Sequence, residues 1–115
     1  MYYRRRHQNS ERKAGNIGDW VQRWGGDYEA MIVLDADSIM SAKSMVTLSR
    51  RLAAAPGVGL IQTLPTLVFA NTLYSRLQQF ANQCFGPIYA AGLSAWHGLS
   101  SKFWGHNAII RTRAF

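Results

Sequence analysis

The segment from Met31 to Asp37 constrains the fold of this chain more than any other. Four apolar residues, Met-Ile-Val-Leu, run directly into Asp35-Ala-Asp37. A short, fully apolar run is typical of a buried strand in an α/β sheet, and such sheets bind ligands beyond the carboxyl ends of their strands. Along an extended chain Asp35 and Asp37 would point the same way, with Ala36 turned aside. The segment therefore predicts a strand that ends in a polar site.

The two carboxylates of this segment predict a cation. Like charges so close repel each other unless a positive ion lies between them. Mg²⁺ or Mn²⁺ is the expected ion, because both take oxygen ligands and leave positions open for phosphate oxygens. Asp35 and Asp37 are therefore the candidate metal ligands, with a diphosphate as the candidate substrate group. Two alternatives stay open: an exposed turn with solvated acids, and an Asp-x-Asp phosphatase that uses Asp35 as its nucleophile.

The charges are distributed very unevenly along the chain. All six Asp and Glu residues lie between Glu11 and Asp37, and residues 38–115 carry Lys and Arg but no carboxylate, within a net charge of +7. A phosphatase of the Asp-x-Asp kind needs further acids downstream, so this distribution speaks against it. An anionic partner is expected. We do not expect nucleic acid, because the run from Tyr2 to Arg6 lacks the continuing aromatic residues of single-strand platforms.

Apolar spacing, together with the positions of Gly and Pro, predicts alternating helices and strands. In chain order we expect a helix over 14–24, a strand over 30–34, a helix over 41–55 with Ser41 as its N-cap, a strand over 58–63, a helix from Leu73 that Gly86-Pro87 ends, a loop over 92–101 and a final strand that reaches Arg111. This order favours an α/β fold with a mostly parallel sheet, flanking helices and missing strands at both ends. The uncharged stretch 77–101 holds too many polar residues to span a membrane.

Several motifs follow one another in an order that resembles the processive family 2 glycosyltransferases, which are membrane enzymes with the Rossmann-like GT-A fold, such as cellulose synthase. They are Arg12-Lys-Ala-Gly-Asn16, Asp35-Ala-Asp37, Ile61-Gln-Thr-Leu-Pro65, Gln78-Gln79 and Phe103-Trp-Gly-His-Asn-Ala-Ile-Ile-Arg111. Finer matches, among them Ala95-Trp-His-Gly98, resemble the bacterial enzymes that build the backbone of osmoregulated periplasmic glucans. The resemblance implies that residues 1–115 are the central part of a family 2 catalytic domain.

The resemblance also implies roles for individual residues. The donor would be bound by Lys13, Asp35, Gln62 and Thr63, the divalent metal by Asp35 and Asp37, and the pocket where donor meets acceptor would be lined by Trp104, Gly105, His106 and Asn107. Independently of the resemblance, a binding role for Trp104 and His106 beside Gly105 is one interpretation, since glycine lets a backbone approach a ligand and an indole face stacks on sugars. A core Trp beside a hydrogen-bonded His is the alternative interpretation.

The function implied is transfer of glucose from UDP-glucose to a growing β-glucan. The catalytic base of the family, an acidic residue of a Thr-Glu-Asp type motif, would follow Phe115, so we expect no catalytic residue here and no activity from the 115 residues alone. The parent protein would lie in the bacterial inner membrane, with this segment on its cytoplasmic side. A non-catalytic module that binds a nucleotide or another polyanion is the remaining alternative.

Overall fold

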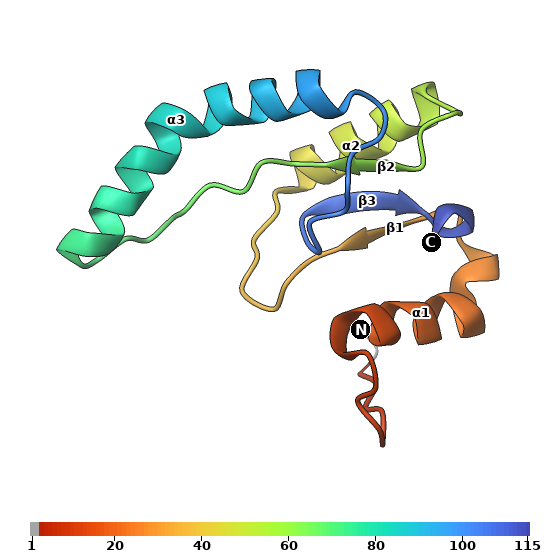
Figure 1. Cartoon of the computed structure of the whole chain (residues 1–115). Coiled ribbons are helices and arrows are strands. Elements are labelled where there is room, and N and C mark those ends of the chain that lie inside the picture. The colour runs from red at the N-terminus through yellow and green to blue at the C-terminus, as the bar shows by residue number, and fades with distance from the viewer. Residues whose placement is uncertain (1–2) are drawn as a thin grey trace.

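The computed structural model describes residues 3–115. Tyr2, the first residue of the run from Tyr2 to Arg6, therefore lies outside the described residues. It is a small α/β domain in which α1 covers one face of a three-stranded sheet and α2 the other (Figure 1). The helices are α1 (Arg12–Trp24), α2 (Ala42–Ala54) and α3 (Leu73–His97), the strands are β1 (Ala30–Val33), β2 (Leu60–Gln62) and β3 (Ala108–Arg111), and two short 3₁₀ turns are η1 (Gly25–Asp27) and η2 (Thr112–Ala114).

The sheet has the order β1-β3-β2, and both neighbouring pairs are antiparallel. The prediction of a mostly parallel sheet is therefore wrong for these strands. β1 and β2 do run in the same direction, as a helical crossover between them requires, but β3 enters between them and runs the opposite way. The register pairs Ala108 of β3 with Val33 on one side and with Gln62 on the other.

Each face of the sheet buries its own apolar cluster, because successive side chains of a strand point to opposite faces. On the α1 side the cluster is Val33, Ala108 and Ile110, with Ile17, Met31, Leu60 and Phe103 packed around it. On the α2 side it is Leu48, Leu52 and Ile109, surrounded by Ala30, Ile32, Met40, Val58 and Ile61. The predicted N-cap of α2 is confirmed: the Ser41 hydroxyl accepts a hydrogen bond from the Ser44 amide at 3.1 Å.

The third helix is much longer than the sequence predicts. Gly86-Pro87 does not end it, and residues 92–97, expected in a loop, are helical up to His97. Proline removes one helical hydrogen bond and bends a helix, but the Ile-Tyr-Ala-Ala run that follows Pro87 resumes the helix. The bend is visible in Figure 1. Gly86 is the buried residue of α3, and a Cβ there would lie 3.3 Å from the Leu64 side chain.

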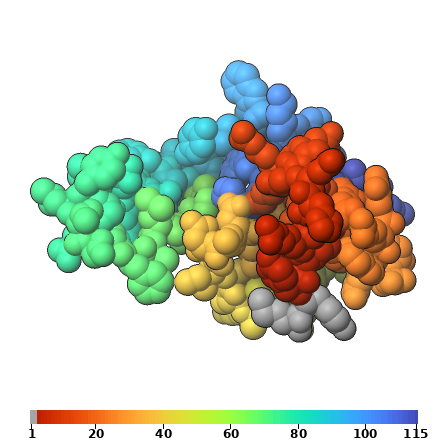
Figure 2. Space-filling model, turned by 90° about the horizontal axis from the view of Figure 1, so that it is seen from below, coloured from red at the N-terminus to blue at the C-terminus, as the bar shows by residue number. Residues whose placement is uncertain are grey.

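Many apolar side chains of α3 face solvent. The exposed residues of this helix include Leu73, Leu77, Phe80, Ile88, Tyr89 and Trp96. The start of this helix projects beyond the sheet, as Figures 1 and 2 both show. Despite its length, α3 falls short of the hydropathy of a bilayer-crossing segment, and so does every other helix within residues 3–115.

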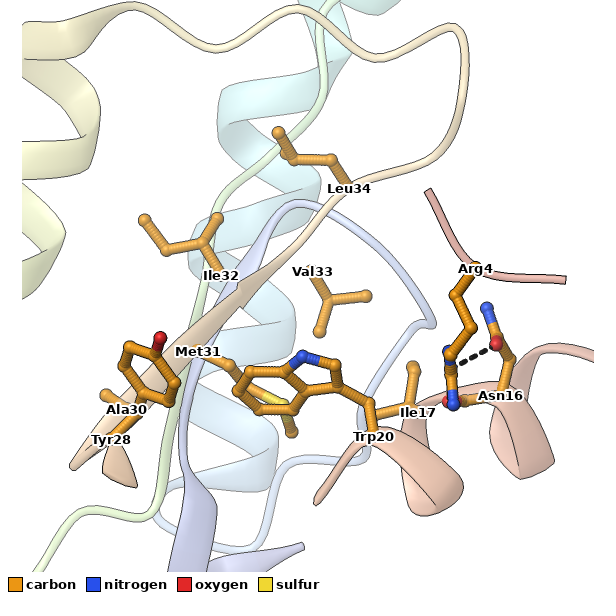
Figure 3. A pocket seen from close by; sticks show the side chains of 10 residues that line it. All are labelled: Arg4, Asn16, Ile17, Trp20, Tyr28, Ala30, Met31, Ile32, Val33 and Leu34. Atoms are coloured by element: carbon orange, nitrogen blue, oxygen red, sulfur yellow. Dashed lines mark hydrogen bonds between the residues drawn. The ribbon is translucent and has the colours of Figure 1, made fainter. Parts of the chain in front are cut away.

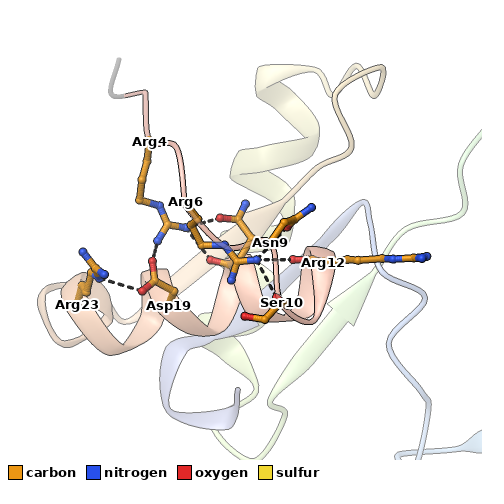
Figure 4. A network of polar contacts seen from close by, with 8 residues as sticks. Arg4, Arg6, Asn9, Ser10, Arg12, Asp19 and Arg23 are labelled. Carbon is orange, nitrogen blue, oxygen red and sulfur yellow. Dashed lines mark hydrogen bonds and ion pairs between the residues drawn. The ribbon is translucent and has the colours of Figure 1, made fainter.

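Two of the arginines that precede α1, Arg4 and Arg6, make polar contacts within the domain. Arg4 forms an ion pair with Asp19 of α1, and Asp19 also accepts from Arg23 at 2.9 Å. Arg6 donates to the side chain of Asn9 at 3.0 Å and to two backbone carbonyls (Figure 4). These contacts tie the N-terminal segment to the first helix.

Candidate metal and diphosphate site

The register of the sheet brings the predicted site residues to one edge. Asp35 follows the carboxyl end of β1, Gln62 and Thr63 lie at the carboxyl end of β2, and Trp104 to Asn107 precede the amino end of β3. Because β3 is antiparallel to both neighbours, its amino end meets their carboxyl ends. Three segments that lie far apart in the sequence therefore meet around Ala108.

The two candidate metal ligands lie in a turn. β1 ends at Val33, one residue before the predicted end, and the amide of Ser38 donates to the carbonyl of Asp35 at 3.1 Å. The expected alternation along an extended strand thus does not apply to the carboxylates, because the chain has already turned. Asp35 is partly buried, whereas Asp37 is exposed. The turn offers one carboxylate held by the domain and one open to an incoming ion.

Lys13, near the start of α1, forms an ion pair with Asp35. The hydrogen bond from Lys13 is the main cause that lowers the pKa of Asp35 from its ordinary value; desolvation opposes it, and the charges of Lys13 and His106 add to the lowering. The lowered pKa favours the carboxylate form of Asp35, which is the form that binds a cation. The structure thus brings together Lys13, Asp35 and His106, three predicted site residues from three separate segments.

Gln62 and Thr63 hold the loop that carries the pocket residues. The Gln62 side chain donates to the Lys102 carbonyl at 2.9 Å and accepts from the Trp104 amide at 3.1 Å. The amide and the hydroxyl of Thr63 both donate to the Asn107 carbonyl at 2.9 Å. Contact of both residues with the donor stays a prediction. The hydrogen bonds that the structure shows for them are with the loop before β3.

Two residues of this loop have left-handed backbone conformations, with φ of +99° at Gly105 and +49° at Asn107. Glycine and asparagine tolerate this backbone region best, which explains why these residue types occur at the two positions. The buried Oδ1 atom of Asn107 has no hydrogen-bond partner within the described part of the chain. Unpaired buried oxygens are rare in folded domains, so this atom is an acceptor that the described residues leave without a donor.

The turn fits a metal that arrives with a diphosphate. Within residues 3–115 no His, Cys, Asp or Glu joins Asp35 and Asp37 to make a cluster of three or more. Two carboxylates alone make a poor cage, but Mg²⁺ is often held by one or two carboxylates together with substrate phosphates. A metal at this turn would therefore need further oxygen ligands, such as those of a diphosphate.

A separate groove of about 420 Å³ lies on the α1 side of β1 (Figure 3). Its walls include Ile17 and Trp20 of α1, Tyr28, and residues 30–34, which comprise β1 and the residue after it. The groove stops short of Asp35, so it is distinct from the candidate site.

One proximity and one set of contacts were not foreseen. His106, which is expected in a sugar pocket, also lies close enough to Asp35 to help lower its pKa. Arg111, the last residue of a quoted motif, donates to the carbonyls of Val58, Leu52 and Ala55 and so joins β3 to the carboxyl end of α2. The sequence feature that could have indicated such a cap is an Arg that ends an otherwise apolar strand.

The chain is similar over its full length to curated bacterial proteins named glucans biosynthesis glucosyltransferase H. It is 54% identical over 115 residues to the protein of Xanthomonas campestris pv. campestris strain B100, and 53% identical to those of Xylella fastidiosa strain 9a5c and Rhodopseudomonas palustris strain TIE-1. It spans only 18% of the first two relatives and 16% of the third. No protein-family model and no solved structure matches the chain.

Proposed function

We propose that this chain, homologous over its full length to part of the proteins named glucans biosynthesis glucosyltransferase H, forms the metal- and donor-binding part of a family 2 glycosyltransferase domain of the GT-A type. The reaction is transfer of glucose from UDP-glucose to a growing β-glucan, within osmoregulated periplasmic glucan synthesis. The observation that carries the proposal is the register around Ala108, which gathers the Asp35 turn, the end of β2 and the Trp104–Asn107 loop at one sheet edge. Residues 1–115 then belong to a single catalytic domain.

Each group at this edge has a part in binding the donor. Asp35 and Asp37 hold Mg²⁺ or Mn²⁺, which supplies Lewis-acid stabilisation of the charge on the departing UDP. Gln62 and Thr63 fix the loop, and the loop places its Trp104 and Asn107 side chains beside the sugar. Positioning of this kind accounts for a large share of the rate enhancement in group transfer.

The catalytic base is expected downstream of Asp37, but residues 38–115 contain no Asp or Glu. We therefore propose that the base lies outside residues 1–115. The parent protein is proposed to lie in the bacterial inner membrane, with this segment on the cytoplasmic side. The acceptor is a β-glucan and the donor UDP-glucose. The homologue names do not favour the alternative of an Asp-x-Asp phosphatase, for which a phosphoryl group on Asp35 would be diagnostic.

The test is a calorimetric titration of the wild-type chain with UDP, performed with and without Mn²⁺. Mn²⁺ is expected to strengthen UDP binding, and Asp37→Ala to weaken the Mn²⁺-dependent binding by about tenfold or more, because a metal ligand is lost. Asp27→Ala removes another exposed acid, which lies in η1 before the amino end of β1, and this variant is expected to bind like wild type.

Binding that ignores Mn²⁺ but falls steeply with salt would instead identify a polyanion-binding module. UDP-glucose turnover by the 115 residues alone would contradict the placement of the base outside them.

A further inference from the structure

The ion pair between Lys13 and Asp35 places a protein cation on a proposed metal ligand. Lys13 comes from the first turn of α1, and Asp35 lies 22 residues later, beyond β1. The two side chains are 41% and 40% exposed, so water and ions reach both. Before any ligand arrives, the carboxylate of Asp35 already has a positive partner.

A divalent ion and the Lys13 ammonium compete for the same carboxylate. Two cations drawn to one oxygen atom repel each other. A metal ion that binds without nucleotide must therefore compete with the ion pair between Lys13 and Asp35. Lysine has a long, flexible stem and a compact charge, so it moves to a new anion easily.

A diphosphate changes this balance, because it brings negative charge to the same edge. We propose that Lys13 is an exchangeable counterion: it holds Asp35 in the nucleotide-free chain and passes from this carboxylate to the phosphate oxygens when metal and diphosphate bind together. This inference rests on the proposed function. It adds that part of the mutual strengthening between metal and nucleotide comes from Lys13, because the exchange lets both cations keep an anionic partner.

The test measures Mn²⁺ binding from the electron paramagnetic resonance signal of the free ion, with and without UDP. In Lys13→Gln, Mn²⁺ alone is expected to bind about two- to fivefold more tightly, because the competing cation is gone. The factor by which UDP strengthens Mn²⁺ binding is expected to shrink at least as much. Lys13→Arg keeps the charge and is expected to restore the strengthening by UDP, while Lys43→Gln, an exposed lysine of α2, controls for net charge.

Nuclear magnetic resonance of the wild-type chain gives a second readout that needs no variant. The Lys13 side-chain resonances are expected to shift with Mg²⁺ and UDP together, and much less with Mg²⁺ alone. Unchanged or weaker binding of Mn²⁺ alone by Lys13→Gln would overturn the exchange, while strengthening by UDP in wild type would still support the proposed function. Absence of any such strengthening in wild type would contradict the proposed function itself.

Discussion

Replacing Leu52 by alanine is expected to lower the free energy of unfolding by about 3 kcal/mol. Leu52 is 3% exposed and packs with Leu48 and Ile109 between α2 and the sheet. Truncation leaves a cavity that this small cluster cannot fill, so lost burial and lost contacts add together. Urea denaturation followed by circular dichroism measures the effect.

The matched control for Leu52 is Leu73→Ala, the same substitution at a residue of α3 that is 87% exposed. It is expected to change stability by no more than about 0.5 kcal/mol. Ile109→Val provides a smaller step of about 1 kcal/mol in case Leu52→Ala leaves too little folded protein to measure. Equal losses for both leucine variants would contradict the placement of the core between α2 and the sheet.

Replacing Arg111 by alanine is expected to lower the free energy of unfolding by about 2 kcal/mol. Its guanidinium donates to the carbonyl of Val58 at 3.0 Å and to those of Leu52 at 2.6 Å and Ala55 at 3.3 Å. Two of these carbonyls belong to the last turn of α2 and its cap, where each also accepts from one backbone amide, Leu52 from Ala55 at 3.2 Å and Ala55 from Val58 at 3.0 Å. Alanine leaves partly buried acceptors without their charged partner.

The control for Arg111 is Arg113→Ala, which removes the same charge two residues away. Arg113 is exposed and has one contact, with the Pro56 carbonyl at 3.4 Å. This variant is expected to lie within about 0.5 kcal/mol of wild type in the same urea experiment. A loss at Arg113 as large as that at Arg111 would indicate a general charge effect in place of a specific cap.

Local signals predicted much of the fold. The apolar run before Asp35 predicts β1 to within one residue, and Ser41 predicts the start of α2, because strand burial and N-capping depend on neighbouring residues. The length of α3 was not predictable from Pro87, since a proline inside a helix can bend it without ending it. Many apolar residues of α3 face solvent, which their spacing along the sequence does not reveal.

Strand order and residue contacts depend on pairing between distant segments. Alternation of helix and strand predicts an α/β fold, but it cannot show that β3 enters between β1 and β2 in the antiparallel direction. The Asp-x-Asp pattern predicts a cation at Asp35, but it does not reveal that Lys13 already lies there. The motif order places Gln62 near the site, whereas its hydrogen bonds to the loop before Asn107 follow only from the register.

The central claim is that the Asp35 turn and the loop before β3 bind a divalent metal together with a nucleoside diphosphate. Paramagnetic broadening by Mn²⁺ in the amide spectrum of the UDP-bound chain tests it most directly. We predict that the amides of 35–38 and 104–107 broaden first, while those of 52–54, at the far end of α2, stay sharp. Broadening centred on another acidic segment, such as that around Asp27, or no selective broadening at all, would contradict the claim.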